Sequence, residues 1–429
     1  MKKLLGILVL GLLLSSNAFA DKYPKLKDPV KSISGSIKKL KVPGKIDLKD
    51  YKVKNPGYKI YIDVAKRRAE LKGHKNNYRL CKPFKNIELF PSMPEIGGHK
   101  WKQEGASPID FINFAEPMIE NMNKLVRGWL SSGDIFYLDK MKEQILLWSK
   151  ENAFNVLISD GYNSEWESDF AYIDTLENVR QTLVGMLIAF DVLRQEKALT
   201  PEEDKIIYDW FEKIVAKTSI GTNDGAKDKM PPGNHTEASK ARIYTLWGIL
   251  SGDDKYFQAG LKFYGIALNV TRKDGSSRHE IRKQKGKSNR SKRGLLKMTQ
   301  VVGGMVMIAE VFANQGYDLY SFETKKGVTV HTMVDFLITY IGYPKSGAKK
   351  KAYIDPEIMD TKRILRKTGI NDNTLGWAHA YVKRFPNKET TKKLIKYYLE
   401  PYGWSRYIQN SGGFGMHMSC AYANINKIK

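Results

Sequence analysis

The apolar residues of this chain recur mainly at spacings of three and four, which is the period of an amphipathic helix. The pattern predicts helices over residues 114–130, 134–154, 175–195, 200–218, 237–251, 254–270, 294–315, 329–342 and 391–402. Thr200, followed by Pro201 and two glutamates, combines a cap, a proline in the first turn and acidic residues at the positive end of a helix. Strand patterns are sparse.

Short loops rich in Gly and Asp, such as SSGD and SGDD, join neighbouring predicted helices. Short connections place consecutive helices side by side in antiparallel pairs. We therefore predict an all-α fold built of antiparallel helical hairpins, which forms one large domain over residues 76–429.

The residues before this domain have a different character. Residues 21–75 are rich in Lys, Pro and Gly and show little apolar periodicity, so we interpret them as a basic extended arm that wraps the domain. Residues 1–20 carry two lysines, an apolar run and Ala18-Phe19-Ala20, the pattern of a signal peptide cleaved after Ala20. We expect a periplasmic or secreted protein. No later segment approaches the roughly 20 apolar residues that a membrane span needs.

The cysteine content and the net charge limit which metal sites and partners we expect. An exported chain with only Cys81 and Cys420 is expected to join them in one disulfide, and two cysteines exclude a cysteine-based metal site. No cofactor or metal is predicted, and we expect a monomer. The formal charge is +25, and loss of Lys2 and Lys3 with the signal lowers it to +23.

A strongly positive net charge creates an electrostatic field that favours a polyanionic partner. An exported protein meets acidic polysaccharides more often than nucleic acid, so we predict an acidic polysaccharide and no nucleic acid. The alternative is a basic, solvated surface without a specific partner.

A dense basic loop lies between two predicted helices. Between residues 272 and 293 only Asp274 and Glu280 oppose the cations Arg272, Lys273, Arg278, Arg282, Lys283, Lys285, Lys287, Arg290, Lys292 and Arg293. This loop is either a solvated surface segment or, because both of its ends are fixed in the domain, part of an anion-binding site.

The pair Asn234-His235 follows MPPG and precedes a helical pattern. Asn is a good helix cap. A histidine in the first turn feels the positive end of the helix dipole, which lowers its pKa and keeps the imidazole neutral and able to accept a proton. The alternatives are a purely structural cap and an ordinary exposed histidine.

The stretch Gly233-Asn234-His235 resembles the alginate lyases of polysaccharide lyase family 5. Their signature is an Asn-Asn-His-x-Tyr-Trp helix start, followed some fifty residues later by an Arg and a Tyr on another helix; Gly233 replaces the first Asn. MIAEVFANQGYDL, SSGD, and VRQTLVGMLIAF with IIYDWFEKI are similar to family segments in order and spacing. The resemblance covers roughly residues 75–425. It implies an incomplete (α/α) toroid and a polysaccharide lyase that needs no metal.

Counting back without gaps from MIAEVFANQGYDL puts Arg290 at the family's Arg and Lys297 at the family's catalytic Tyr. Matching the family's Glu-Leu-Lys-Arg stretch to residues 280–283 instead makes Arg282 or Lys283 the equivalent of the Arg. Both registers remain open.

A uronate lyase removes the C5 proton of a uronic acid and expels the 4-oxygen. Asn234 and an arginine suit the donors that must neutralise the substrate carboxylate. His235 would be the base or would share in that neutralisation, and a second residue would protonate the leaving oxygen.

Lys297 would fill this last role if Arg290 and Arg293, expected on the same helical face, depress its pKa. Otherwise Lys297 is solvated or binds a carboxylate, and a tyrosine such as Tyr244 acts as the acid.

Further residues are candidates for binding sugars. Tyr162 and Trp166 lie in the loop GYNSEWESDFAY and suit stacking on sugar faces, whereas Trp210 and Trp247 are expected in the core. Arg180 was placed at the start of the next helix as a carboxylate ligand. Arg282, Arg293 and Tyr244 complete the candidate binding residues.

The sequence lacks the motifs of P-loop nucleotide hydrolases, zinc proteases and serine esterases. The leading hypothesis is therefore a lyase that cleaves an alginate-like or polymannuronate-like polymer by β-elimination. The alternative is a non-catalytic binding protein for acidic glycans on the same toroid, and hydrolysis is a third possibility.

Overall fold

The computed structural model describes most of the helical domain and most of the arm. The described residues are 28–57, 59–75, 77, 81–85, 87–90, 95–96, 108–154, 156–157, 169–218, 231–281, 294–341, 365–366, 369–370, 375–400 and 416–424.

The predicted all-α fold is confirmed. The helices that form the hairpins are α6 (Pro108–Ser132), α7 (Ile135–Lys150), α8 (Asp169–Gln195), α9 (Pro201–Thr218), α10 (His235–Ser251), α11 (Asp254–Val270), α12 (Gly294–Asn314), α13 (Val330–Ile341), α15 (Trp377–Arg384) and α16 (Glu389–Leu394). Further described helices are α2 (Pro29–Ser32), η1 (Leu48–Asp50), α3 (Val64–Leu71), η6 (Ile395–Leu399) and α17 (Met418–Tyr422).

The described strands are two residues long. β1 (Glu95–Ile96) pairs in parallel with β2 (Val156–Leu157), and β3 (Leu365–Arg366) pairs antiparallel with β4 (Gly369–Ile370).

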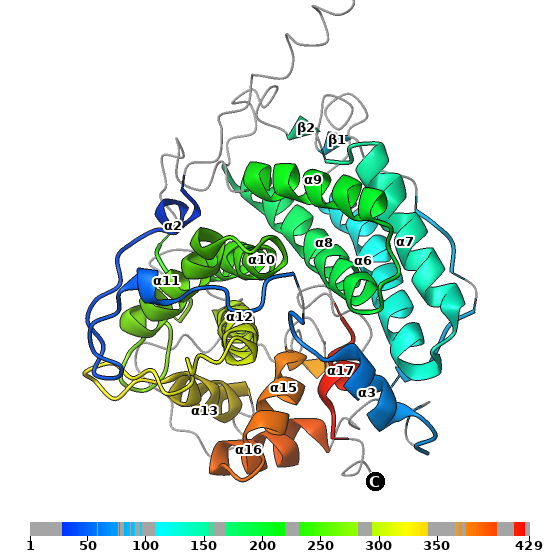
Figure 1. Cartoon of the computed structure of the whole chain (residues 1–429). Coiled ribbons are helices and arrows are strands. Elements are labelled where there is room, and N and C mark those ends of the chain that lie inside the picture. The colour runs from blue at the N-terminus through cyan, green and yellow to red at the C-terminus, as the bar shows by residue number, and fades with distance from the viewer. Residues whose placement is uncertain are drawn as a thin grey trace, which may run out of the picture.

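Consecutive helices pair and follow one another around the molecule, from α6 and α7 to α15 and α16 (Figure 1). The helices α6, α8, α10, α12 and α15 contact one another in that order and form the inner layer. Each is joined to an outer helix that follows it in the chain. This is the incomplete toroid that the sequence predicts.

The inner helices α10 and α12 form the centre of the core. Every residue from Thr236 to Leu250 is buried, and α12 is buried almost throughout. The two helices approach closely, because a side chain at Gly304 would come within 3.0 Å of the Ala238 methyl group. Their amino-terminal ends carry His235 and Lys297, so this packing positions the candidate site.

Among the described helices, α12 is long and apolar enough by length and composition to cross a membrane, but polar residues interrupt its apolar run and 83 % of its most apolar window is buried inside the protein. Its apolarity reflects an inner helix that is covered on most sides.

The amino-terminal arm crosses several helices. The Gly57 N–H donates to the Ile249 carbonyl of α10 at 2.6 Å, and the Ile60 N–H donates to the Asp191 carboxylate of α8 at 3.0 Å. Asn314 at the end of α12 donates to the carbonyls of Ile60 and Tyr61 at 3.0 Å each. The arm is thus fixed by polar contacts to helices far away in the sequence.

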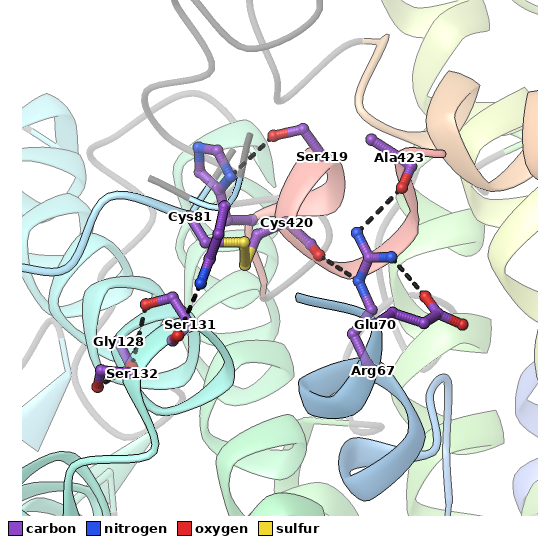
Figure 2. The surroundings of a disulfide bond; sticks show 11 residues. Arg67, Glu70, Cys81, Gly128, Ser131, Ser132, Ser419, Cys420 and Ala423 are labelled. Atoms are coloured by element: carbon purple, nitrogen blue, oxygen red, sulfur yellow. Dashed lines mark hydrogen bonds and ion pairs between the residues drawn. A yellow bond between two sulfur atoms is a disulfide. The ribbon is translucent and has the colours of Figure 1, made fainter. Parts of the chain in front are cut away.

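The predicted disulfide is confirmed: Cys81 and Cys420 are bonded across a sequence separation of 339 residues. Figure 2 shows Arg67 of α3 beside it. The Arg67 guanidinium donates to the carbonyls of Cys420 (2.7 Å) and Ala423 (3.0 Å) and pairs with Glu70. The disulfide and Arg67 therefore attach the end of the chain to the segment just before the toroid.

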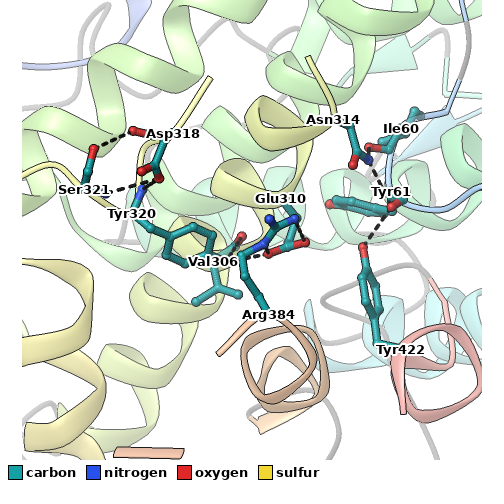
Figure 3. A network of polar contacts seen from close by, with 10 residues as sticks. All are labelled: Ile60, Tyr61, Val306, Glu310, Asn314, Asp318, Tyr320, Ser321, Arg384 and Tyr422. Atoms are coloured by element: carbon teal, nitrogen blue, oxygen red, sulfur yellow. Dashed lines mark hydrogen bonds and ion pairs between the residues drawn. The ribbon is translucent and has the colours of Figure 1, made fainter. Parts of the chain in front are cut away.

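A second polar cluster joins α12 to α15 at the far end of α12 from Lys297. The Arg384 guanidinium is bidentate to Glu310, and the Tyr320 hydroxyl donates to the same carboxylate at 2.8 Å (Figure 3). Burial and the Glu310 carboxylate both raise the pKa of Tyr320, so its hydroxyl stays protonated and donates.

Candidate active site

The turn before α10 is built by Gly233 and Asn234. Gly233 has φ +75°, and a side chain there would lie 3.1 to 3.3 Å from Val270 and Ala267 of α11. Asn234 caps α10, because its Oδ1 accepts the backbone N–H of Glu237 at 2.9 Å. The capping interpretation of Asn234 is thus confirmed. The amide oxygen accepts this bond, and any hydrogen bond that the Asn234 side chain donates comes from Nδ2.

His235 is the first residue of α10 and contacts a carboxylate. Its Nδ1 and its backbone N–H each lie 2.9 Å from Glu280 Oε1. The side chain of His235 is 14 % exposed and that of Glu280 is 5 % exposed. An ionised carboxylate only accepts hydrogen bonds, so Nδ1 carries a proton and donates to Glu280, which leaves Nε2 as the nitrogen that accepts a proton when the ring is neutral.

The Glu280 carboxyl group is ionised at neutral pH. Burial alone would raise its pKa, but the charge and hydrogen bonds of His235 and the charge of Lys297 outweigh burial and lower the pKa to about 2. The carboxylate favours a protonated imidazole, whereas the helix dipole favours a neutral one. The sequence-based expectation of a neutral His235 therefore considered only one of two opposing influences.

Arg272, another cation of the basic loop, holds the part of the loop that carries Glu280. Thr271 and Ser277 form an isolated antiparallel bridge. The Arg272 Nη1 donates to the carbonyls of Ser277 (3.3 Å) and Ile281 (2.9 Å), on either side of Glu280. Arg272 thus holds the loop and fixes the position of Glu280.

Lys297 lies in the first turn of α12 and is half-buried. Its charge acts on the Glu280 carboxylate and contributes to the lowered pKa of that group. Arg290 and Arg293, which are predicted to share a helical face with Lys297, lie outside the described residues, so that arrangement stays a prediction.

Two candidate binding residues are buried. Tyr244 is 0 % exposed, and its hydroxyl accepts a hydrogen bond from Ser32 of the arm at 3.2 Å. Arg180 is also 0 % exposed, lies inside α8 and not at its start, and donates to the Thr218 carbonyl at 2.6 Å. The structure does not place either side chain where a sugar could contact it.

The remaining candidates, Tyr162, Trp166, Arg282 and Lys283, lie outside the described residues. Trp210 and Trp247 are core residues, as predicted. Within the described residues no group of three or more potential metal ligands occurs.

Glu280 was missed as a site residue by sequence reasoning. It appeared as one of two acids in a basic loop, 45 residues after His235, and as the first residue of the alternative register at 280–283, without a role of its own. The available signal was an acidic residue among ten cations, since a carboxylate in such a loop is well placed to pair with a functional cation.

Comparisons with known proteins agree with this fold. The sequence model of the alginate lyase family matches residues 114–346. Comparison with curated protein sequences gives no match.

Three solved structures illustrate the similarity. Alginate lyase A1-III from Sphingomonas species A1 has a TM-score of 0.64 and 18 % identity, over 88 % of this chain and 99 % of that chain. Its tyrosine-to-phenylalanine variant, complexed with a tetrasaccharide, has a TM-score of 0.66 and 19 % identity over the same shares. An alginate lyase from Bacteroides ovatus has a TM-score of 0.56 and 14 % identity, over 86 % of this chain and 100 % of that chain.

These structural likenesses establish the shared toroid, and the family match spans more than half of the sequence. The chain therefore belongs to the alginate lyase family.

Proposed function

We propose that this polysaccharide lyase cleaves a uronate polymer of the alginate type by β-elimination, with His235 as the base and Lys297 as the acid. The observation that carries the proposal is the contact of His235 with Glu280 at 2.9 Å, with the charge of Lys297 acting on the same carboxylate. A base and a carboxylate that orients it thus meet at the start of α10, and a cation in the first turn of α12 acts on that carboxylate.

Glu280 prepares His235 for proton abstraction. By accepting from both Nδ1 and the backbone N–H, it fixes the ring and directs Nε2 away from itself. Its negative charge also stabilises the imidazolium that forms when Nε2 takes the C5 proton. Glu280 stays ionised throughout, so it orients and stabilises His235 and does not itself carry the proton.

The elimination balances with the residues of this chain. The C5–H bond breaks and its proton moves to His235 Nε2, while the electron pair forms the C4=C5 double bond. The C4–O4 bond breaks, and the Lys297 ammonium protonates the departing oxygen. Exchange with water resets both groups, and the product carries an unsaturated uronate at its new end.

The substrate carboxylate must be neutralised for the C5 proton to become acidic. Asn234 Nδ2 adjoins His235 and supplies one hydrogen-bond donor. We assign the second donor to the basic segment, at Arg290 or, in the alternative register, at Arg282 or Lys283. Arg293 and the aromatic residues Tyr162 and Trp166 are proposed for neighbouring sugar units.

The place of action is also a proposal. Residues 1–20 carry the pattern of a signal peptide and the mature chain is strongly basic, which suits a periplasmic or secreted enzyme that meets anionic polymers. We expect it to act as a monomer.

The test is to incubate the mature protein with polymannuronate, polyguluronate and glucuronan. A lyase releases products that absorb in the ultraviolet and whose masses sum to that of the polymer, whereas a hydrolase adds one water for each bond cleaved. Salt-sensitive binding without any product would instead support the binding-protein alternative.

A further inference from the structure

We infer that Glu237 is a positioning residue for the elimination and that it links the catalytic turn to the amino-terminal arm. This inference rests on the proposed function, because Glu237 acts through Asn234 and His235. It assigns the arm a role in the reaction beyond covering the toroid.

Glu237 holds two backbone N–H groups around the start of α10 and bonds the Asn234 side chain. Glu237 is 1 % exposed. Its Oε2 accepts the Gly233 N–H at 3.0 Å, and its Oε1 accepts the Ser34 N–H of the arm at 2.7 Å. Its own N–H donates to Asn234 Oδ1 at 2.9 Å. Gly233, directly before the Asn234-His235 pair, and Glu237, two residues after it, are thus joined through one side chain.

Two departures from the family signature meet in this contact. In the Asn-Asn-His-x-Tyr-Trp pattern, Gly233 stands at the first Asn and Glu237 at the Tyr. Gly233 adopts a positive φ against α11, and its N–H is the group that Glu237 binds. The two residues of this stretch that differ from the signature at these positions thus contact each other directly.

The arm is bound firmly at this point. Lys240 of α10 donates to the Ser32 carbonyl at 2.6 Å, and Lys262 of α11 donates to the carbonyls of Val30 and Ile33 at 2.8 and 2.7 Å. Burial lowers the pKa of Lys262, and the Glu237 carboxylate opposes that effect. The buried anion thus has a cation nearby, which reduces the cost of its burial.

The arm also presses directly on the loop before the site. Gly35 has φ +85°, and a side chain there would come within 3.0 Å of Pro232 Cβ. Pro232 precedes Gly233, so a displaced arm would shift the turn that carries Asn234 and His235. Small displacements of a base from its target atom lower the rate of the chemical step strongly and leave much of the binding energy intact.

The first test variant is Glu237→Gln. An amide keeps the size of the side chain but can accept only with its oxygen, so its NH2 group faces either the Gly233 or the Ser34 N–H. We expect kcat to fall about 10-fold or more with KM changed less than about threefold. The His235 imidazole titration, followed by NMR, is expected to shift.

The second variant, Gly35→Ala, perturbs the same turn from the arm and leaves α10 unaltered. Gly44 provides the matched control, because it lies in the same arm with φ +102° and has no atom within 4 Å of an added side chain. We expect Gly35→Ala to lower kcat and to shift the His235 titration, and Gly44→Ala to affect stability alone. The double variant of Glu237 and Gly35 is expected to lose less than the product of the two single losses.

The inference is overturned if Glu237→Gln and Gly35→Ala keep the wild-type kcat and His235 titration, if Gly44→Ala lowers kcat equally, or if the two losses multiply. A wild-type protein that cleaves no uronate polymer would reject the proposed function instead. The NMR titration then still decides whether Glu237 and the arm position His235.

Discussion

At the scale of single residues, local chemistry could be predicted and long-range pairing could not. The Asn234-His235 pair stands out in the sequence because capping depends on neighbours within one helical turn. Glu280 reaches His235 only through the path of the chain after α11. No rule of local spacing connects the two, so the sequence indicated the base but not the carboxylate that orients it.

Substitution of Glu280 tests the role of that carboxylate. We predict that Glu280→Gln lowers kcat about 100-fold or more, because an amide can present its NH2 to Nδ1 and favour the wrong tautomer. Initial rates of unsaturated-product formation measure the effect. Glu323→Gln removes a carboxylate from the exposed pair with Lys41 and serves as the control. Equal rates for both variants would contradict the assignment.

The same carboxylate makes stability depend on pH. Its pKa in the folded protein is about 2, below the ordinary value of 4.5, so its contribution to stability is present above pH 4.5 and is lost as the pH falls toward 2. We predict that the wild type loses more free energy of unfolding between pH 5 and pH 3 than Glu280→Gln does. Urea unfolding at both pH values measures this, and parallel losses would count against it.

Lys297 can be tested by two replacements. We predict that Lys297→Met lowers kcat about 100-fold or more, because it removes the proton donor for the leaving oxygen. Lys297→Tyr restores the group found at this position in the family signature, so we expect it to keep substantially more activity than Lys297→Met. Equal activity of Lys297→Met and the wild type would exclude Lys297 as the acid.

At the scale of elements, the helices were largely predictable because apolar periodicity follows directly from burial on one face. α7, α9, α11 and α13 begin and end within a few residues of the predicted stretches. α15 was missed because its sequence WAHAYVKR is short. α12 was predicted as a helix, and its high apolarity reflects an inner helix that is covered on most sides.

The ion pair between α12 and α15 gives a prediction at this scale. Glu310 is nearly buried, with 6 % of its side chain exposed, and Arg384 is its bidentate partner. We predict that Arg384→Met lowers the free energy of unfolding by about 3 kcal/mol, because it leaves a buried carboxylate without its cation.

The exposed pair of Lys205 and Asp209 provides the control for this prediction. Asp209→Asn should change the free energy of unfolding by less than about 1 kcal/mol. Urea denaturation of both variants makes the comparison. Equal effects would show that Arg384 contributes no more than a surface ion pair.

At the scale of the whole molecule, the sequence predicted a ring of helical hairpins through its resemblance to a family, and the arm only as an extended segment. The attachment of the arm was not predictable, because it depends on side chains more than two hundred residues away, such as Glu237 and Lys262. Several candidate sugar-binding residues lie outside the described part of the chain and remain predictions.

The disulfide should stabilise the molecule as a whole. Cys81 and Cys420 lie 339 residues apart, so their bond closes a long loop of the unfolded chain. We predict that replacing both by alanine lowers the free energy of unfolding by about 2 to 5 kcal/mol. Urea unfolding with and without a reductant measures this. The reductant should destabilise the wild type and leave the double variant unchanged; a wild type insensitive to it would contradict the prediction.

The most direct measurement compares the wild type with His235→Ala on polymannuronate, recording the ultraviolet absorbance of the unsaturated product together with salt-dependent binding of the polymer. The account predicts a steady rise in absorbance for the wild type and none for His235→Ala, with similar binding by both proteins. An absent rise in the wild type, or an equal rise in both, would contradict it.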